Sequence, residues 1–161
     1  MNTSRALVIH VLLLVVVTTT WGLLATRGRK NSIDMELCMG CICEATSNCN
    51  LTFQCTRGLC GPFLISEIYW KEAGRPTITG DNPNRKGAYH KCVTEPYCAA
   101  ATVHQYLAKY HQDCNGDGRI DCDDFARIHY MGGHQCKINM NHLGYYKIFR
   151  ECNKSLQKLM G

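Results

Sequence analysis

The 161-residue sequence lacks internal repeats and low-complexity tracts, which excludes repeat architectures. After residue 25 it has no apolar run long enough to cross a membrane. The Cys-Cys-x-x-His-Asp motif of secreted phospholipases is also missing, since the nearest sequence is Tyr-His-Gln-Asp at 110–113. Most of its histidines show no metal-ligand spacing: His90, His104, His111, His134 and His142.

Cysteine, by contrast, is abundant. The sequence has 12 cysteines, and half of them fall between Cys38 and Cys60. Cysteines this close together form either a zinc site, where thiolates converge on the metal, or a disulfide framework that restricts the unfolded chain. The redox compartment decides between the two uses.

The N-terminus indicates that compartment. Residues 1–25 resemble a secretory signal peptide, with an apolar run over 6–17 and cleavage expected after Gly22 or Ala25. The alternative is a retained membrane anchor. It is disfavoured by His10 and three threonines in the apolar stretch, and by basic residues directly after it. We therefore expect a secreted protein with no membrane span after cleavage.

An even number of cysteines in an oxidising compartment predicts about six disulfides and disfavours zinc. At roughly 2–4 kcal/mol each, they supplement the modest core of a mature chain of about 135 residues. The formal charge of +5 falls to +4 when Arg5 leaves with the signal. A mildly basic secreted protein is attracted to bacterial walls, acidic glycans or membrane surfaces, although such a charge also serves ordinary solubility.

Hydrophobic spacing and turn residues predict a mainly α-helical, disulfide-rich single domain with a small β-hairpin. A flexible arm over 26–36 precedes the domain at 37–155, and a tail follows at 156–161. The expected elements are a short helix within 38–49, a hairpin over 51–59 closed at Cys55 and Cys60, helices over 62–73, 97–111, about 122–130 and about 145–159, a surface loop over 75–91, and Thr94 as a helix N-cap. Asn50 and Asn153 each begin an N-glycosylation sequon.

The segment 113–124 matches the twelve-residue EF-hand loop, with Gly118 at the sharp turn. Its last position is Asp124 rather than the usual bidentate Glu, and Cys114 and Cys122 lie inside it. Two interpretations stay open: a calcium site, or an acidic turn held by disulfides. The expected calcium ligands are Asp113, Asn115, Asp117, Arg119, Asp121 and Asp124.

Several motifs together resemble the invertebrate-type lysozyme family, also called the destabilase family. They are Cys-x-x-Cys-Ile-Cys at 38–43, Cys-Gly-Pro-Phe-Leu-Ile-x-Glu-x-Tyr-Trp at 60–70, Gly-Arg-Pro at 74–76, Tyr-Cys-Ala at 97–99, Phe-Ala-Arg-Ile-His at 125–129, Gly-Gly-x-x-Cys at 132–136 and Gly-Tyr-Tyr at 144–146. The resemblance implies a lysozyme-like fold and hydrolysis of the β-1,4 bond between N-acetylmuramic acid and N-acetylglucosamine. It implies peptidoglycan or a related amino-sugar glycan as partner, no nucleic acid and no required cofactor. Some family members are credited with isopeptidase or chitinase activity.

The two carboxyl groups that such hydrolysis needs are both missing. The family has its acidic Glu in Cys-Ile-Cys-x-x-Glu-Ser-Gly-Cys, where this chain has Thr46. The family Asp lies between the next two cysteines, which here enclose only residues 56–59. A threonine hydroxyl cannot serve as a general acid. Two weak substitutes are Glu44, turned about 200° away on a helix, and Glu67, which follows a family position.

The resemblance also implies further residues. His129 matches the family histidine, but the serine expected with it is absent, so a structural role is favoured over an isopeptidase one. Candidate sugar-stacking residues are Tyr69, Trp70, Tyr145 and Tyr146, although aromatics at such spacings more often belong to the core. The implied local disulfides are Cys43–Cys49, Cys55–Cys60 and Cys92–Cys98, and the partners of Cys38, Cys41, Cys114, Cys122, Cys136 and Cys152 stay open.

We therefore expect a lysozyme-family protein with weak or absent muramidase activity that still binds glycan. One alternative is an active lysozyme that uses Glu44 or Glu67. Another is a calcium-stabilised interaction protein without enzymatic activity.

Overall fold

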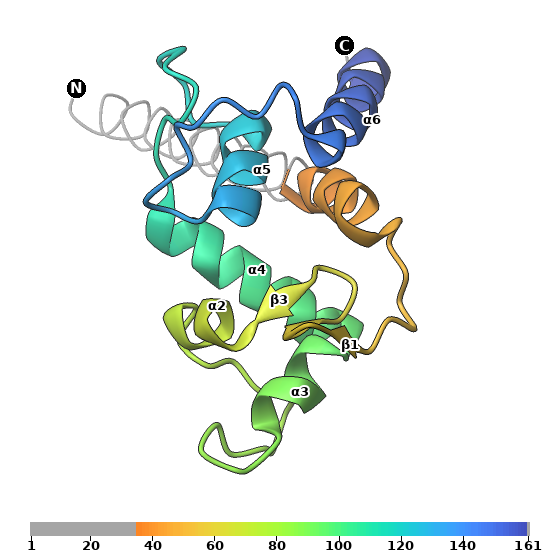
Figure 1. Cartoon of the computed structure of the whole chain (residues 1–161), viewed down its shortest axis with the longest axis vertical. Coiled ribbons are helices and arrows are strands. Elements are labelled where there is room, and N and C mark those ends of the chain that lie inside the picture. Colours follow the sequence, from red (N-terminus) through yellow and green to blue (C-terminus); the bar gives the residue numbers. More distant parts are fainter. Residues whose placement is uncertain (1–34, 161) are drawn as a thin grey trace, which may run out of the picture. The chain divides into compact units, whose positions relative to one another are not determined.

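The computed structural model describes residues 35–160 (Figure 1). The expected signal peptide at 1–25 and nearly all of the expected arm at 26–36 lie outside the described residues. The chain divides into two compact units, Met1–Glu36 and Leu37–Gly161, and the second is described below together with Met35 and Glu36, which begin its first helix. None of the helices within 35–160 combines the length and the hydropathy that a membrane span requires.

Helices dominate this unit, as predicted, and they accompany a small antiparallel sheet. The elements are helix 35–47, β1 (Cys55–Thr56), β2 (Leu59–Cys60), β3 (Ile65–Ser66), α2 (Glu67–Glu72), α3 (Ala88–Val93), α4 (Pro96–Tyr110), α5 (Cys122–Met131) and α6 (Gly144–Met160). The sheet has the order β1-β2-β3. In Figure 1, the sheet lies beside α2, while α5 and α6 lie toward the opposite end.

The predicted hairpin is present, but a third strand extends it. β1 and β2 pair antiparallel, with Thr56 opposite Leu59. Arg57 and Gly58 form the turn with φ values of 48° and 80°, the left-handed conformations that suit a two-residue hairpin. β3 pairs with the other side of β2.

The prediction of one helix over 62–73 is wrong in its first half. Leu64 has a φ of 48°, which a continuing α-helix does not allow. The chain then forms β3, and α2 begins only after Ser66, whose hydroxyl accepts a hydrogen bond from the Tyr69 N–H at 3.1 Å. Phe63 is therefore buried from a loop instead of a helix face.

The surface loop predicted over 75–91 ends at Gly87, because α3 follows it and buries Ala88. The predicted N-cap of the next helix is also one residue early. The Glu95 carboxylate accepts from the backbone N–H of Cys98 at 2.7 Å, so Glu95 is the N-cap of α4. Thr94 instead donates its hydroxyl to the His90 carbonyl at 2.7 Å.

The last two helices agree with the sequence prediction to within about two residues. α5 ends at Met131, directly before Gly132. α6 continues to Met160, so residues 156–160 of the expected tail are helical. The largest fully buried side chains of the core include Phe149, Ile42, Ile65, Leu107 and Ile128.

All 12 cysteines are paired, and no free cysteine remains. The three local bridges implied by the family resemblance are confirmed: Cys43–Cys49, Cys55–Cys60 and Cys92–Cys98. The long-range bridges are Cys38–Cys122, Cys41–Cys152 and Cys114–Cys136. Two of these attach helix 35–47 to α5 and to α6, across 84 and 111 residues of sequence. They fix one wall of the cleft described next.

Candidate functional site

A cleft of about 740 Å³ is lined by helix 35–47, by the segment around β3, and by α2, α4, α5 and α6. Its lining is mainly apolar and aromatic. Each helix contributes at least one side chain: Thr46, Tyr69, Tyr106, Tyr130 and Tyr145. The volume lies within the range typical of small-molecule sites, about 300–1,000 Å³.

Thr46 lies in the cleft wall, and its hydroxyl donates to the Ile42 carbonyl at 2.6 Å, one turn earlier in the helix. Its donor is therefore used within its own helix. Glu44, two residues before Thr46, is exposed and does not line the cleft. This position agrees with the rotation expected for two residues of an α-helix.

Glu67 also lies outside the cleft. Its carboxylate pairs with the Lys71 ammonium at 2.8 Å, and the hydrogen bond from Lys71 lowers the pKa of Glu67. Glu67 lines a separate, basic cavity. Within residues 35–160, Glu72 is the one carboxylate that lines the cleft. Sequence reasoning missed it, although Glu72 follows Tyr69 by three residues and so shares its helix face.

His129 lies against the cleft and uses both ring nitrogens. Nε2 lies 3.1 Å from the Phe63 carbonyl oxygen, which can only accept, so Nε2 carries the hydrogen. Burial lowers the pKa of His129 to about 4, despite the bond to Phe63, so the ring is neutral at pH 7. Nδ1 therefore accepts from the Tyr69 hydroxyl at 3.2 Å. These contacts give His129 a bridging role between α5, α2 and the Phe63 segment.

Two of the four predicted sugar-stacking residues lie around the cleft. Tyr69 stacks on Tyr106 at a centroid distance of 3.6 Å. Tyr145 stacks on Tyr130 at 4.5 Å. Tyr130 is 49% exposed, which leaves its ring accessible to a ligand. The sequence did not single out Tyr130, since nothing local distinguishes it from other helix tyrosines.

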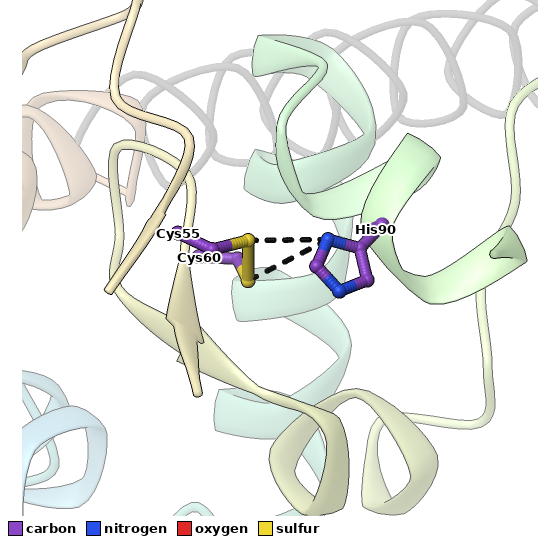
Figure 2. A group of neighbouring side chains, drawn as sticks. All are labelled: Cys55, Cys60 and His90. Carbon is purple, nitrogen blue, oxygen red and sulfur yellow. Dashed lines mark hydrogen bonds between the residues drawn. A yellow bond between two sulfur atoms is a disulfide. The ribbon is translucent and has the colours of Figure 1, made fainter. Parts of the chain in front are cut away.

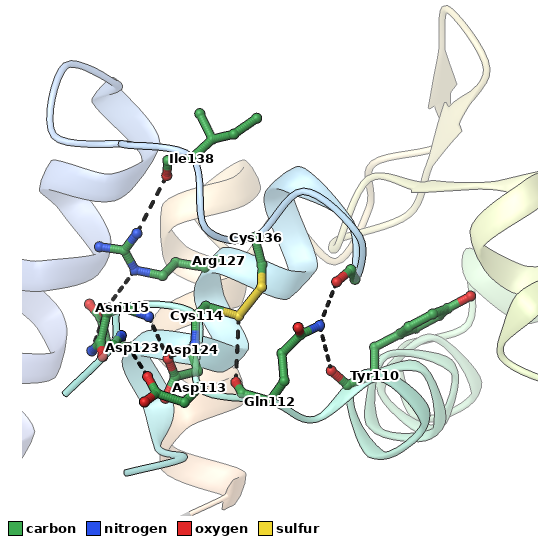
Figure 3. Close-up of a disulfide and its surroundings, with 12 residues drawn as sticks. Tyr110, Gln112, Asp113, Cys114, Asn115, Asp123, Asp124, Arg127, Cys136 and Ile138 are labelled. Carbon is green, nitrogen blue, oxygen red and sulfur yellow. Dashed lines mark hydrogen bonds and ion pairs between the residues drawn. A yellow bond between two sulfur atoms is a disulfide. The ribbon is translucent and has the colours of Figure 1, made fainter. Parts of the chain in front are cut away.

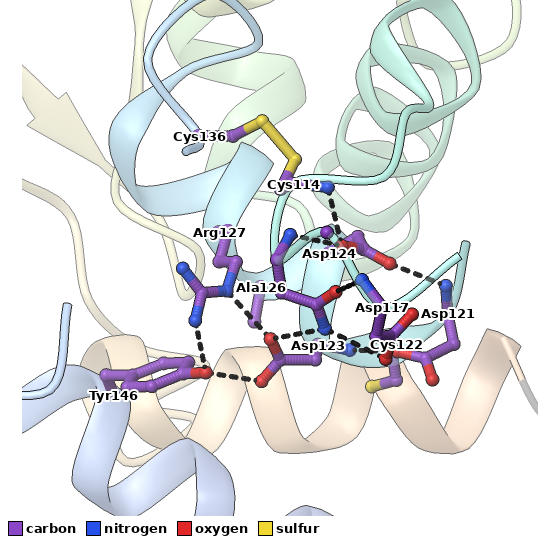
Figure 4. Close-up of polar contacts among 12 residues, drawn as sticks. Cys114, Asp117, Asp121, Cys122, Asp123, Asp124, Ala126, Arg127, Cys136 and Tyr146 are labelled. Carbon is purple, nitrogen blue, oxygen red and sulfur yellow. Dashed lines mark hydrogen bonds and ion pairs between the residues drawn. A yellow bond between two sulfur atoms is a disulfide. The ribbon is translucent and has the colours of Figure 1, made fainter. Parts of the chain in front are cut away.

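The other two predicted aromatics lie elsewhere. Trp70 is buried, and its indole N–H donates to the Pro76 carbonyl at 2.7 Å. Tyr146 is also buried and donates its hydroxyl to Asp123 at 2.6 Å (Figure 4). Arg127 completes this network by donating to Asp123 at 2.7 Å and to the Tyr146 hydroxyl at 2.8 Å. These groups are satisfied within the protein, and sugar stacking by Trp70 and Tyr146 stays a prediction.

A second cavity, of about 610 Å³, lies beside α6 and includes Tyr146. Its charged lining mixes signs: Asp121, Asp123, Lys147, Arg150, Glu151 and Lys154. The sequon residue Asn153 also lines it, and the sequon residue Asn50 is exposed. Glycosylation of either asparagine stays a prediction.

In the loop 113–124, most of the predicted calcium ligands accept hydrogen bonds from backbone N–H groups of the loop itself. Asp124 is fully buried, and one of its oxygens accepts from the N–H groups of Cys114 at 2.8 Å and Asn115 at 3.2 Å (Figure 3). Its other oxygen accepts from the Asp121 N–H at 2.9 Å. Asp113 accepts from the glycine N–H groups at 116 and 118, at 2.7 and 2.9 Å. The remaining predicted ligands, Asn115, Asp117 and Asp121, accept in the same way, whereas Arg119 is exposed.

Figure 2 shows the one cluster of metal-ligating residue types within residues 35–160: Cys55, Cys60 and His90. The His90 Nδ1 lies 3.1 Å from the Cys55 sulfur and 3.9 Å from the Cys60 sulfur. The two sulfurs form a disulfide. Because metals bind thiolates and not disulfide sulfurs, this cluster is no zinc site in the oxidised protein.

Comparison with known proteins relates this geometry to a family. The Destabilase family model matches residues 35–152. The lysozyme of Meretrix lusoria is 32% identical over 129 residues, which cover 78% of this chain and 90% of that protein. Invertebrate-type lysozyme 3 of Caenorhabditis elegans is 29% identical over 119 residues, covering 71% of this chain and 84% of that protein.

A solved structure gives the same result for the fold. It is the crystal structure of Aeromonas hydrophila PliI in complex with Meretrix lusoria lysozyme, matched with a TM-score of 0.53 at 31% identity. The match covers 71% of this chain and 87% of the solved one. Because the family model spans most of the chain and a relative above 30% identity is matched over nearly its whole length, the chain belongs to the destabilase family, that of the invertebrate-type lysozymes.

Proposed function

We infer that this protein is a secreted, glycan-binding member of the family whose muramidase activity is weak or absent. The observation that carries this proposal is the composition of the cleft, in which Thr46 stands at the family position of the acid and, among the described residues, Glu72 is the one carboxylate that lines the cleft. Hydrolysis by the usual mechanism needs one carboxyl as acid and a second as nucleophile or base. A single carboxylate leaves one of these roles unfilled.

The β1–β2 hairpin supports the same proposal. The family's second carboxylate belongs between the cysteines that close this hairpin. Here the two strands are joined by Arg57 and Gly58 alone, and the paired residues Thr56 and Leu59 directly flank that turn. The segment carries no acidic residue. Loss of both groups is expected to lower the rate by orders of magnitude.

Retained binding rests on the aromatic lining. Sugar rings present apolar faces that stack on aromatic side chains, and Tyr130 is both exposed and supported from behind by Tyr145. The hydroxyl groups of Thr46 and Ser66 and the carboxylate of Glu72 add polar partners to the lining. The ligand class that suits such a cleft is the glycan of peptidoglycan or a related amino-sugar polymer.

A turbidity assay on purified peptidoglycan, with an active invertebrate-type lysozyme as control, tests the proposal together with a pull-down on the same wall material. We expect sedimentation with the wall and no clearing. Clearing at the rate of the control would refute the loss of activity, and failure to sediment would refute binding. Thr46→Glu alone is expected not to restore clearing, because the family's second carboxylate, between Cys55 and Cys60, is still missing and Glu72 does not stand at that position.

Secretion is part of this proposal and rests on the signal-like residues 1–25 and on the six disulfides. Expression of the full chain in animal cells, followed by N-terminal sequencing of the medium, is expected to give a start after Gly22 or Ala25. Removal of N-glycans from the same material reports whether Asn50 and Asn153 are occupied. Retention of the chain in the cell would contradict the proposal.

A further inference from the structure

The cleft carries one formal charge at neutral pH. Among its lining side chains, Glu72 is the only carboxylate, and no lysine or arginine lines it. His129 adds no charge, since burial lowers its pKa to about 4. The remaining polar lining consists of neutral hydroxyl groups of threonine, serine and tyrosine. A ligand in this cleft therefore meets a single negative charge among aromatic rings.

None of the four ion pairs within residues 35–160 includes the Glu72 carboxylate. The Lys109 ammonium donates to the backbone carbonyl of Glu72 at 3.0 Å. Burial raises the pKa of the Tyr106 hydroxyl, the hydrogen bond from the Gly133 N–H opposes this shift, and the charge of Glu72 raises the pKa further. Tyr106 and Glu72 both line the cleft.

A carboxylate outside these ion pairs and in partly apolar surroundings favours a cationic ligand, because the local dielectric is lower than in water. Tyrosine rings add to the attraction, since their faces bind ammonium groups. An amino sugar with a free 2-amino group carries such an ammonium, with three N–H donors. The N-acetylated sugar presents a neutral amide instead.

We propose that this cleft selects β-1,4-linked amino-sugar glycans that carry free, protonated 2-amino groups over their N-acetylated forms, with Glu72 as the residue that recognises the ammonium. The inference rests on the proposed function, because it assumes that the cleft holds an amino-sugar glycan. Two natural sources share this chemistry, de-N-acetylated chitin and de-N-acetylated peptidoglycan.

The other two cavities do not offer this selectivity. The cavity that contains Glu67 is basic and would repel an ammonium group. Its cationic lining is Lys71, Arg75, Arg85 and Lys86. The cavity beside α6 holds acidic and basic side chains together, with Asp123 already paired to Arg127. Of these three cavities, only the cleft of Glu72 has an acidic side chain and no lysine or arginine in its lining.

The test is calorimetric titration of the purified disulfide-bonded protein with a hexamer of glucosamine and, separately, a hexamer of N-acetylglucosamine at low salt. We expect the glucosamine hexamer to bind about tenfold more tightly, as one charge-assisted hydrogen bond supplies. Glu72→Gln is expected to abolish the difference. Glu67→Gln removes the same charge from the same helix and is expected to preserve it. Added salt should reduce the preference of the wild type.

The outcomes separate the inference from the proposed function. Binding of neither hexamer would refute the inference alone if the protein still sediments with peptidoglycan, and would refute both if it does not. Equal binding of both, or a preference that survives in a folded Glu72→Gln protein, would refute the inference alone. Glu72→Asp retains the charge, so partial recovery of the preference is expected. Sedimentation of the protein with chitin and with peptidoglycan, each before and after enzymatic de-N-acetylation, distinguishes the two sources. The source is the polymer whose de-N-acetylation strengthens sedimentation.

Discussion

The contacts of His129 predict a specific loss of stability in mild acid. The ring is held neutral, with Nε2–H donating to the Phe63 carbonyl and Nδ1 accepting from Tyr69. Protonation of Nδ1 would leave it facing a hydroxyl whose hydrogen already points at it. The pKa of His129 falls from 6.5 to about 4 in the folded protein because of burial. The unfolded chain therefore binds a proton more readily than the folded chain between these two pH values.

The direction in which pH changes the free energy of unfolding follows from proton linkage. Because the unfolded state binds more protons between pH 6.5 and about 4, the free energy of unfolding decreases as the pH falls through this window. A fall in pKa from 6.5 to about 4 corresponds to about 3 kcal/mol when complete. His129 as a residue is only partly buried and lines the cleft, so solvent screens part of the effect and we expect about 2 kcal/mol.

The assay is urea denaturation at a series of pH values from 7 to 4, on the wild type and on His129→Gln. Glutamine can donate to Phe63 and accept from Tyr69, but it does not titrate. All other ionisable groups are common to both proteins, so the difference between the two pH profiles reports His129 alone. Parallel profiles would refute the argument, as would a wild type that gains stability toward pH 4 relative to the variant.

Three further predictions concern the loop 113–124 and the sheet. Asp124→Ala leaves buried N–H groups without an acceptor and is expected to lower the free energy of unfolding by about 3 kcal/mol in chemical denaturation, with the exposed Asp117→Ala as control. Gly61→Ala would force a Cβ into the Val93 carbonyl at a positive φ, so we expect a loss above about 4 kcal/mol or no folded secretion. Millimolar calcium is expected to raise the melting temperature, because a loop site with a dissociation constant of about 10⁻⁴–10⁻³ M would fill. Equal melting temperatures in calcium and in EDTA would refute the calcium site and support a hydrogen-bonded turn.

The long helices could be predicted from sequence because each presents a sustained apolar face. α4, α5 and α6 span 15, 10 and 17 residues, enough to distinguish a period of 3.6 from chance. The segment 62–73 was different. Its apolar residues are spaced as well for a helix as those of the long helices. The helix is prevented by the left-handed backbone conformation at Leu64. The sequence gives no sign of this conformation, since leucine rarely adopts it.

The residues of the candidate site also fall into two groups, those that the sequence marks and those that only the fold brings to the cleft. Thr46 and His129 were found because a family pattern marks their positions in the sequence. Glu72 and Tyr130 were not, since their importance arises from α2 and α5 meeting around one cavity. Trp70 was selected for its residue type, yet its indole lies in the core with its N–H already bonded to Pro76. Residue type thus identifies candidates, and tertiary packing decides which of them face a ligand.

The disulfides explain how the cleft can change its chemistry without loss of the fold. Helix 35–47 is attached to α5 and α6 by bridges that close loops of 84 and 111 residues, worth about 4–5 kcal/mol each in the chain-entropy account. The Thr46 hydroxyl contributes one local hydrogen bond to Ile42, a net of about 1 kcal/mol. The identity of residue 46 therefore hardly affects whether this wall forms. For the same reason Thr46→Glu is expected to fold, with its far-ultraviolet spectrum unchanged, so that its failure to clear peptidoglycan would report missing chemistry and not a missing structure.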